Sequence, residues 1–89
     1  MKAVITVVGR DTVGILAKVA SVCADHNANI VDVSQAVLSE MFTMVMVVDI
    51  SDLNSEFSGL QNALSALGDT IGMKIHVMHE DIFNSMHRI

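Results

Sequence analysis

Several residue types are scarce or absent in this 89-residue sequence, and these absences exclude whole classes of protein. There is no proline, tryptophan or tyrosine, the five basic residues form no cluster, and ten acidic residues give a net charge of −5. Without a basic patch or large aromatic side chains on which bases stack, direct binding to nucleic acid or to an anionic membrane is disfavoured. The single cysteine, Cys23, excludes an intrachain disulfide and a zinc site built from several cysteines.

Long hydrophobic runs are missing too, because no apolar stretch reaches the roughly 18 residues that a membrane span needs. Hydrophobic residues nevertheless make up 52% of the chain and charged residues 17%, a balance that excludes intrinsic disorder. The length suits a single domain that buries roughly 60% of its surface on folding. Such a domain has only a modest core, which favours oligomerisation. The N-terminus has neither the long apolar segment nor the cleavage site of a signal peptide, so we expect a cytoplasmic protein.

Hydropathy patterns predict six elements in the order strand, helix, strand, strand, helix, strand. Short runs rich in valine, isoleucine and threonine favour strands at residues 2–8, 30–38, 42–50 and 73–79. Apolar residues at three- and four-residue spacing favour one helix over residues 13–26, and a second of about 17 residues carrying Phe57, Leu60, Leu64, Leu67 and Ile71. The predicted fold class is α+β, a ferredoxin-like βαββαβ domain with a four-stranded antiparallel sheet and two helices on one face.

Residue types at the helix ends predict where the two helices begin and end. Asp11 or Thr12 is the predicted N-cap of the first helix. Gly72 follows the apolar stripe of the second helix, as a C′ glycine does, whereas Gly68 falls inside that stripe and is interpreted as a tolerated weak point. Cys23 lies in line with the apolar residues of the first helix, so we interpret it as a small buried residue.

Residues 81–89 predict a further short amphipathic helix that belongs to the same unit as residues 1–80. Its apolar residues recur at helical spacing, at Ile82, Phe83, Met86 and Ile89. Acidic residues precede them and Arg88 lies near the end, which matches the helix dipole. A tail this apolar predicts docking on the sheet or on a partner subunit. Because the central strands are apolar on both faces, we expect this helix or a second subunit to cover the face that lacks the two long helices.

The segment most informative about function is residues 8–16, where a strand ends in a short loop that opens into a helix. Free amides at a helix start favour an anionic group such as a carboxylate. Gly9 and Gly14 have the spacing of a phosphate-binding P-loop, but Ile15 and Leu16 stand where Lys and Ser or Thr are required, so a P-loop is excluded. Gly14 either contacts a ligand or only lets the helix pack closely on the sheet.

A second candidate position, Asn29, lies where the second predicted strand begins. In a βαββαβ fold this point is at the opposite end of the first helix from Asp11, so one chain is not expected to bring the two polar groups together. Asn29 is either part of a site shared between chains or an ordinary turn residue.

Histidines near acidic residues raise the possibility of metal binding or catalysis. Within a strand, however, His76 and His79 point to opposite faces, and His87 belongs to a different element, so we interpret them as solvated histidines and expect no metal or other cofactor. No strand-to-helix nucleophile elbow, no paired carboxylates and no cysteine in a polar setting are visible in the sequence. We therefore predict no catalytic residues and a protein that is not an enzyme.

Two stretches carry a resemblance to a known family. Residues 8–19, VGRDTVGILAKV, followed by residues 29–35, NIVDVSQ, strongly resemble the ACT domain, and the element order extends the resemblance over residues 2–79. More narrowly, the chain resembles small stand-alone ACT proteins whose function is not established. More distantly, it is similar to the glycine cleavage system transcriptional repressor and to the N-terminal domain of formyltetrahydrofolate deformylase.

This resemblance implies a regulatory module that forms a homodimer and binds a small amino acid or related metabolite at the subunit interface. The ligand-binding residues that it implies are Asp11, Gly14 and Ile15 in one chain and Asn29 and Ile30 in the other. Gly9 stands where serine-binding members have His, and Val13 where many members have Pro, so serine specificity does not transfer. The alternative is a protein-interaction or dimerisation module that binds a protein partner and no small molecule.

Overall fold

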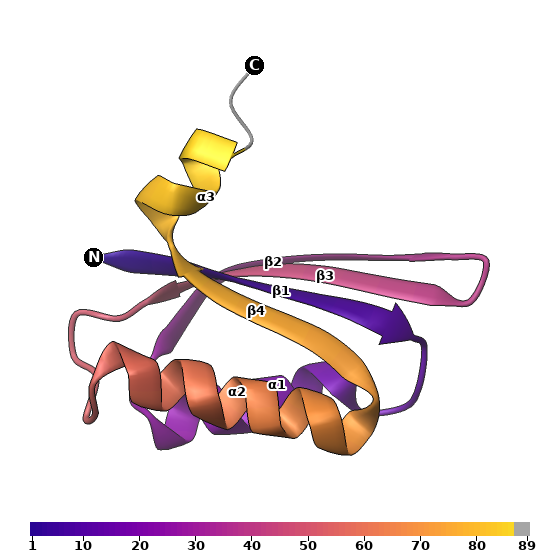
Figure 1. Cartoon of the computed structure of the whole chain (residues 1–89), viewed down its shortest axis with the longest axis horizontal. Helices are drawn as coiled ribbons and strands as arrows, with labels where there is room; N and C mark the ends of the chain where they lie inside the picture. Colours follow the sequence, from indigo (N-terminus) through magenta and orange to yellow (C-terminus); the bar gives the residue numbers. More distant parts are fainter. Residues whose placement is uncertain (87–89) are drawn as a thin grey trace.

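Within residues 1–86, four strands and three helices follow one another in the predicted βαββαβ order, with the third helix after the last strand (Figure 1). The computed structural model describes residues 1–86, so the predicted positions of His87, Arg88 and Ile89 lie outside the described residues. The elements are β1 (Lys2–Arg10), α1 (Ile15–Asp25), β2 (Asn29–Leu38), β3 (Met41–Asp49), α2 (Phe57–Ile71), β4 (Met73–His79) and α3 (Glu80–Met86). No helix in this part of the chain is long and apolar enough to cross a membrane.

The sheet has the strand order β2-β3-β1-β4, and every neighbouring pair is antiparallel, as predicted. Figure 1 shows α1 and α2 together on one face of this sheet, whereas α3 rises from the other face near the end of β4. The strands β2 and β4 are the edges. A register shift between Ile30 and Asp32 interrupts the pairing of β2 with β3, and the sequence pattern did not reveal this bulge.

The hydrophobic core lies between the sheet and the two long helices. Its largest fully buried side chains are Ile5, Met44, Met46, Leu60 and Leu64. Each contributes about 1.5–3 kcal/mol relative to an exposed position, because its apolar surface is removed from water. Burial alternates along β3, where every second side chain is buried. One face of the sheet therefore packs against the helices and forms the core.

The start of α1 differs from the sequence prediction. Neither Asp11 nor Thr12 is the N-cap: the helix begins at Ile15, and Gly14 occupies the N-cap position with a left-handed φ of 85° and no side-chain cap. The backbone amide of Asp11 instead donates to the carbonyl oxygen of Glu40 at 2.9 Å, which ties the loop to the β2–β3 turn. The helix therefore begins two residues later than the predicted start at Val13.

The glycines also have different roles from those expected. A Cβ on Gly14 would meet only Cε of Lys18, at 3.9 Å, so close helix packing does not explain this glycine. Gly68 is not a tolerated weak point, because a Cβ there would lie 2.6 Å from the carbonyl oxygen of Met73 and the close approach of α2 to β4 requires its absence. Gly72 ends α2 as predicted, with a φ of 73°.

Candidate functional site

The loop between β1 and α1 presents an uncapped helix start to solvent. Asp11 and Gly14 are exposed, and within residues 1–86 no side chain caps the first turn of α1. The amides of Ile15, Leu16 and Ala17 precede the first hydrogen bond of the helix, which Lys18 donates to the carbonyl oxygen of Gly14 at 3.0 Å. Such amides carry the partial positive charge of the helix dipole and suit a carboxylate.

The side chain of Ile15 is unavailable to a ligand. It is 3% exposed and belongs to the core, so Ile15 can reach a ligand only through its backbone amide. Val13, by contrast, is 92% exposed directly beside Gly14, and sequence reasoning did not propose it as a contact. The sequence pattern placed Val13 in the apolar stripe of the first helix, but the structure begins that helix at Ile15.

Asn29 and Ile30 lie at the other end of α1. Asn29 is exposed at the start of β2 and, with Ala24, Asn27 and Ala28, lines a shallow hollow of about 270 Å³. The side-chain amide of Asn27 donates to the carbonyl oxygen of Asp52 at 2.7 Å, which fixes the wall of this hollow. Ile30 follows Asn29 in β2, is half-buried and packs against the core.

One chain does not bring the two halves of the candidate site together. α1 has 11 residues and therefore separates the Asp11 loop from Asn29 by about 16 Å, at 1.5 Å per residue. This separation agrees with the expectation from topology. A ligand the size of an amino acid spans less than half of it, so a site that uses both Asp11 and Asn29 needs a second chain.

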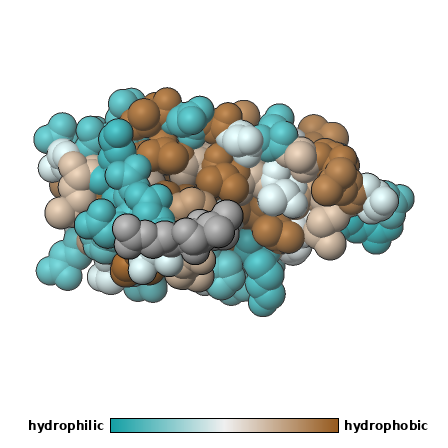
Figure 2. Space-filling model, turned by 90° about the horizontal axis from the view of Figure 1, so that it is seen from above, coloured by the Kyte–Doolittle hydropathy of each residue, from teal (hydrophilic) through white to brown (hydrophobic). Residues whose placement is uncertain are grey.

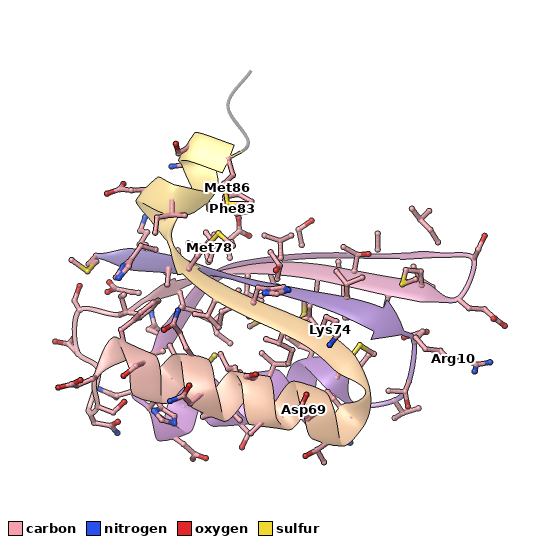
Figure 3. The ribbon with its side chains drawn as sticks, viewed as in Figure 1. Arg10, Asp69, Lys74, Met78, Phe83 and Met86 are labelled. Atoms are coloured by element: carbon pink, nitrogen blue, oxygen red, sulfur yellow. The ribbon has the colours of Figure 1, made fainter. Side chains whose placement is uncertain are left out.

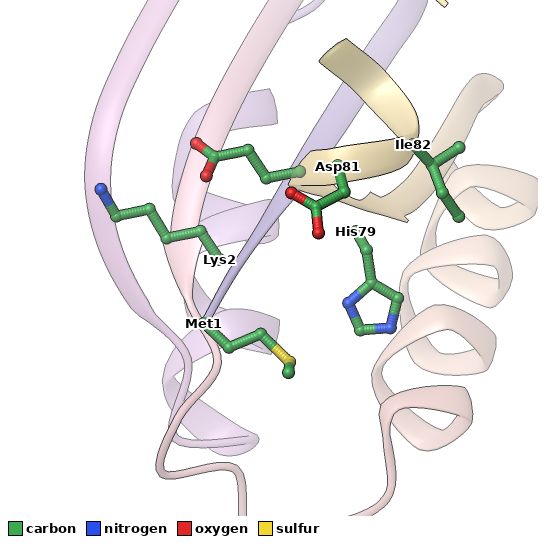
Figure 4. A pocket seen from close by; sticks show the side chains of 6 residues that line it. Met1, Lys2, His79, Asp81 and Ile82 are labelled. Atoms are coloured by element: carbon green, nitrogen blue, oxygen red, sulfur yellow. The ribbon is translucent and has the colours of Figure 1, made fainter. Parts of the chain in front are cut away.

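A second hollow, of about 570 Å³, lies between the start of β1 and the β4–α3 junction (Figure 4). It is lined by Met1, Lys2, His79, Glu80, Asp81 and Ile82. The ring of His79 stacks on Phe57 of α2, with centroids 4.2 Å apart and planes 22° apart. This stacking holds the imidazole toward α2. No group of three or more His, Cys, Asp or Glu side chains in the described residues is placed to hold a metal ion.

The two clear pKa shifts have structural causes. Burial raises the pKa of the Cys23 thiol to about 11, so this cysteine is a neutral core residue rather than a nucleophile, as the sequence suggested. The pKa of Asp49 is lowered, chiefly because the backbone amide of Ser51 donates to its carboxylate at 2.8 Å. Both groups serve packing and turn geometry.

Comparison with known proteins agrees with this architecture. The ACT domain family model matches residues 2–78. A UPF0237 protein of Methanococcus maripaludis is 56% identical over 86 residues, covering 97% of this chain and 96% of that protein. A UPF0237 protein of Listeria innocua is 46% identical over the full length of both chains.

Solved structures give the same result. An ACT domain protein from Streptococcus pneumoniae superposes with a TM-score of 0.80 at 47% identity, covering 93% of each chain. A putative glycine cleavage system transcriptional repressor superposes with a TM-score of 0.72 at 26% identity, and the match covers 85% of this chain but 43% of the repressor. The match of the family model to nearly the whole chain and the identity to full-length relatives lead to one conclusion: the chain belongs to the ACT domain family.

Proposed function

We propose that this protein is a non-catalytic, cytoplasmic regulatory ACT protein that binds a small amino acid or related metabolite at a homodimer interface. The observation that carries the proposal is the uncapped start of α1, which the left-handed Gly14 holds open to solvent. A carboxylate accepting hydrogen bonds there gains about 0.3–1 kcal/mol from the helix dipole, in addition to the hydrogen bonds themselves.

Each implied residue has a chemical role in this proposal. The amides of Gly14 and Ile15 donate to the ligand carboxylate, and the exposed Asp11 carboxylate accepts from the ligand ammonium group. Asn29 and the backbone of Ile30, both from the neighbouring chain, close the other side. Occupancy then links the two chains, so a bound metabolite stabilises the dimer relative to the separate chains and to the unfolded state.

The proposed output is contact between the liganded dimer and an enzyme or a regulator. The repressor that shares the fold is more than twice as long as the matched part, and its name describes transcriptional regulation. This chain matches less than half of that protein. The proposed partner is a separate molecule. Its net charge of −5 supports a protein partner over direct contact with DNA.

A thermal-shift screen against the twenty amino acids tests the proposal. An amino acid present at 100 times its dissociation constant adds about 2.7 kcal/mol of stability, enough to raise the Tm of a small domain by several degrees. We expect a shift with one or a few amino acids, and we expect Asp11→Ala and Asn29→Ala each to abolish it. If both variants retain the shift of the unmodified protein, the proposed site is wrong.

Mixing the two variants tests whether the site is shared between chains. In a heterodimer of Asp11→Ala with Asn29→Ala, one of the two sites contains both substitutions and the other contains neither. Calorimetric titration of the mixture should therefore recover up to about half of the heterodimer sites, whereas each variant alone binds nothing. If the mixture does not bind although heterodimers have been shown to form, the site is not shared between chains in the way proposed.

A second candidate function is a protein-interaction module without a small-molecule ligand. The specific observation that favours it is α3, whose Ile82 and Met86 are 52% and 65% exposed. Deleting residues 81–89 separates the two functions. Loss of the dimer or of a protein partner, with no thermal shift in the intact protein for any amino acid, would favour the interaction module.

A further inference from the structure

The sheet face opposite α1 and α2, which we call the open face, is covered at one end and bare at the other. At the covered end α3 contacts β1 and β4, and Val4 on the open face is only 1% exposed. Figure 3 shows Phe83 and Met86 on the flank of α3 above Met78. At the bare end, beyond the reach of α3, the exposed fractions are 39% for Val8, 49% for Met41 and 73% for Leu38.

The bare end is one continuous apolar area rather than a set of scattered residues. Leu38 pairs directly with Met41 across β2 and β3, and Met41 pairs with Arg10 across β3 and β1. Paired residues share a face of the sheet, so these side chains point to the same side as Val8. Figure 2 shows this face from above, with hydrophobic residues extending along it away from the C-terminal helix.

Charged side chains lie at both ends of the open face. The bare end carries the cations Arg10 and Lys74, and Lys74 pairs with Val8 across β1 and β4. The anions Glu80 and Asp81 open α3 at the covered end, where they line the same hollow as Lys2. Six residues of extended strand separate Lys74 from Glu80, roughly 20 Å at 3.3 Å per residue, so these opposite charges do not meet within one chain.

A two-fold axis that reverses the strand direction would bring these two ends together. Each α3, with its exposed Ile82 and Met86 and its acidic start, would then lie over the apolar and basic bare end of the other chain. The dimensions agree, because stacked sheets pack about 10 Å apart and a seven-residue helix is also about 10 Å long. A self-complementary surface of this kind is what an isologous dimer requires.

We propose that a second copy of this chain binds the open face with its strands reversed, so that each α3 covers Val8, Met41 and Leu38 of the other chain. Four strands of about nine residues make a face of roughly 20 Å by 30 Å. With α3 added, this area approaches the ~800 Å² per partner of a standard stable interface. The proposal rests on the proposed function only for the existence of a homodimer.

Light scattering on the full chain tests the proposal with two variants of matched exposure. Val8, on the open face, is 39% exposed, and Leu16, on α1, is 38% exposed. We expect the unmodified protein to have twice the 9.6 kDa chain mass, Val8→Asp to be monomeric and Leu16→Asp to remain dimeric. Circular dichroism verifies that each variant is folded. We expect both to fold, because each substituted side chain is exposed.

A charge exchange tests the contact between α3 and the bare end. Lys74→Glu and Asp81→Lys should each weaken the dimer by about tenfold, because each places like charges opposite one another. The double variant should restore the affinity. Since these two residues lie at opposite ends of the open face in one chain, only contact between chains explains such a restoration.

Three results would overturn the open-face dimer: an unmodified protein that is monomeric, a dimer that persists in folded Val8→Asp, or a dimer lost in Leu16→Asp alone. The last result would place the interface on α1 and would leave the metabolite proposal standing. Conversely, a dimer that behaves as expected while no amino acid shifts the Tm would remove the metabolite proposal and leave the open-face interface standing.

Discussion

Gly14 has a φ of 85° and stands directly before the first residue of α1. With only Cε of Lys18 near the position of a Cβ, at 3.9 Å, the requirement at this residue is conformational rather than steric. A left-handed backbone costs an L-residue with a Cβ about 1–2 kcal/mol. The same conformation leaves the amides of α1 open to a ligand, so structure and proposed function depend on the same torsion angle.

Substitution of Gly14 should therefore follow backbone preference rather than side-chain size. We expect Gly14→Ala to lower the free energy of unfolding by about 1–2 kcal/mol, and the larger Gly14→Asn to lower it by less, because asparagine adopts the left-handed region more readily. Urea denaturation of both variants measures the difference. A larger loss for Asn than for Ala would mean that space, not φ, decides this position.

Cys23 gives the protein a dependence on alkaline pH. The thiol pKa is about 11 in the folded chain and 9.0 at its ordinary value, because burial disfavours the thiolate. As pH rises through this interval, the unfolded chain loses the proton while the folded chain keeps it. The contribution of Cys23 to the free energy of unfolding is therefore complete below about pH 9. It is lost as the pH rises from about 9 to about 11.

Cys23→Ala removes this contribution. We expect the variant to be less stable at pH 8, since it leaves a small cavity, but to lose less stability than the unmodified protein between pH 9 and pH 11. The sequence contains no tyrosine that would titrate in the same interval, and the lysines are common to both proteins. Equal losses in the two proteins would show that the Cys23 proton is not the cause.

At the scale of elements, the packing of α2 on β4 depends on two glycines from different parts of the chain. Gly68 of α2 approaches the carbonyl oxygen of Met73, and a Cβ on Gly9 of β1 would collide with the side chain of the same methionine. Both helix and strand thus approach Met73 more closely than a side chain allows. Helical periodicity located α2 but carried no information about this contact, because glycine is simply a poor helix former in an isolated pattern.

Two Gly→Ala variants within α2 separate helix propensity from packing. Gly68→Ala should cost about 1–3 kcal/mol because the 2.6 Å approach to a backbone oxygen outweighs a propensity gain of about 1 kcal/mol. Gly59→Ala should change stability by less than about 1 kcal/mol, since its Cβ would meet the exposed Ser55 side chain at 3.0 Å, and that side chain can turn away. Thermal unfolding of both measures the contrast. A stabilised Gly68→Ala would contradict this account of the helix–sheet contact.

At the scale of the whole molecule, the open face makes stability depend on a second chain. The helix-covered face supplies a complete core, whereas Leu38 and Met41 on the other face stay in water in the single chain. Association that involves only the folded state stabilises that state by mass action. Folding and dimerisation are then one coupled equilibrium.

The melting temperature should consequently rise with protein concentration. Over about a hundredfold increase we expect a higher Tm for the unmodified protein and an unchanged Tm for the monomeric Val8→Asp variant. Scanning calorimetry at several concentrations measures both. A Tm independent of concentration in the unmodified protein would indicate that the folded chain gains nothing from a partner over this range.

The sequence alone was sufficient for the element order, the fold class and the family. Strand and helix periodicities differ enough for apolar residues to reveal βαββαβ, and β4 was predicted with the bounds that the structure has, Met73–His79. Local rules also predicted the burial of Cys23 and the role of Gly72 at the end of α2. They predicted as well that His76 and His79 point to opposite faces of the sheet. The separation of Asp11 from Asn29 followed from topology.

Only the tertiary structure decided how these elements meet. The N-cap prediction at Asp11 or Thr12 was wrong because Gly14 takes the N-cap position and α1 begins only at Ile15. The Asp11 amide bonds instead to Glu40, a residue 29 positions away that no local pattern indicates. The closeness of Gly68 to Met73 and the half-covered open face likewise depend on contacts between elements. Periodicity records which side of an element is apolar, but what lies against that side is set by the packing of the whole chain.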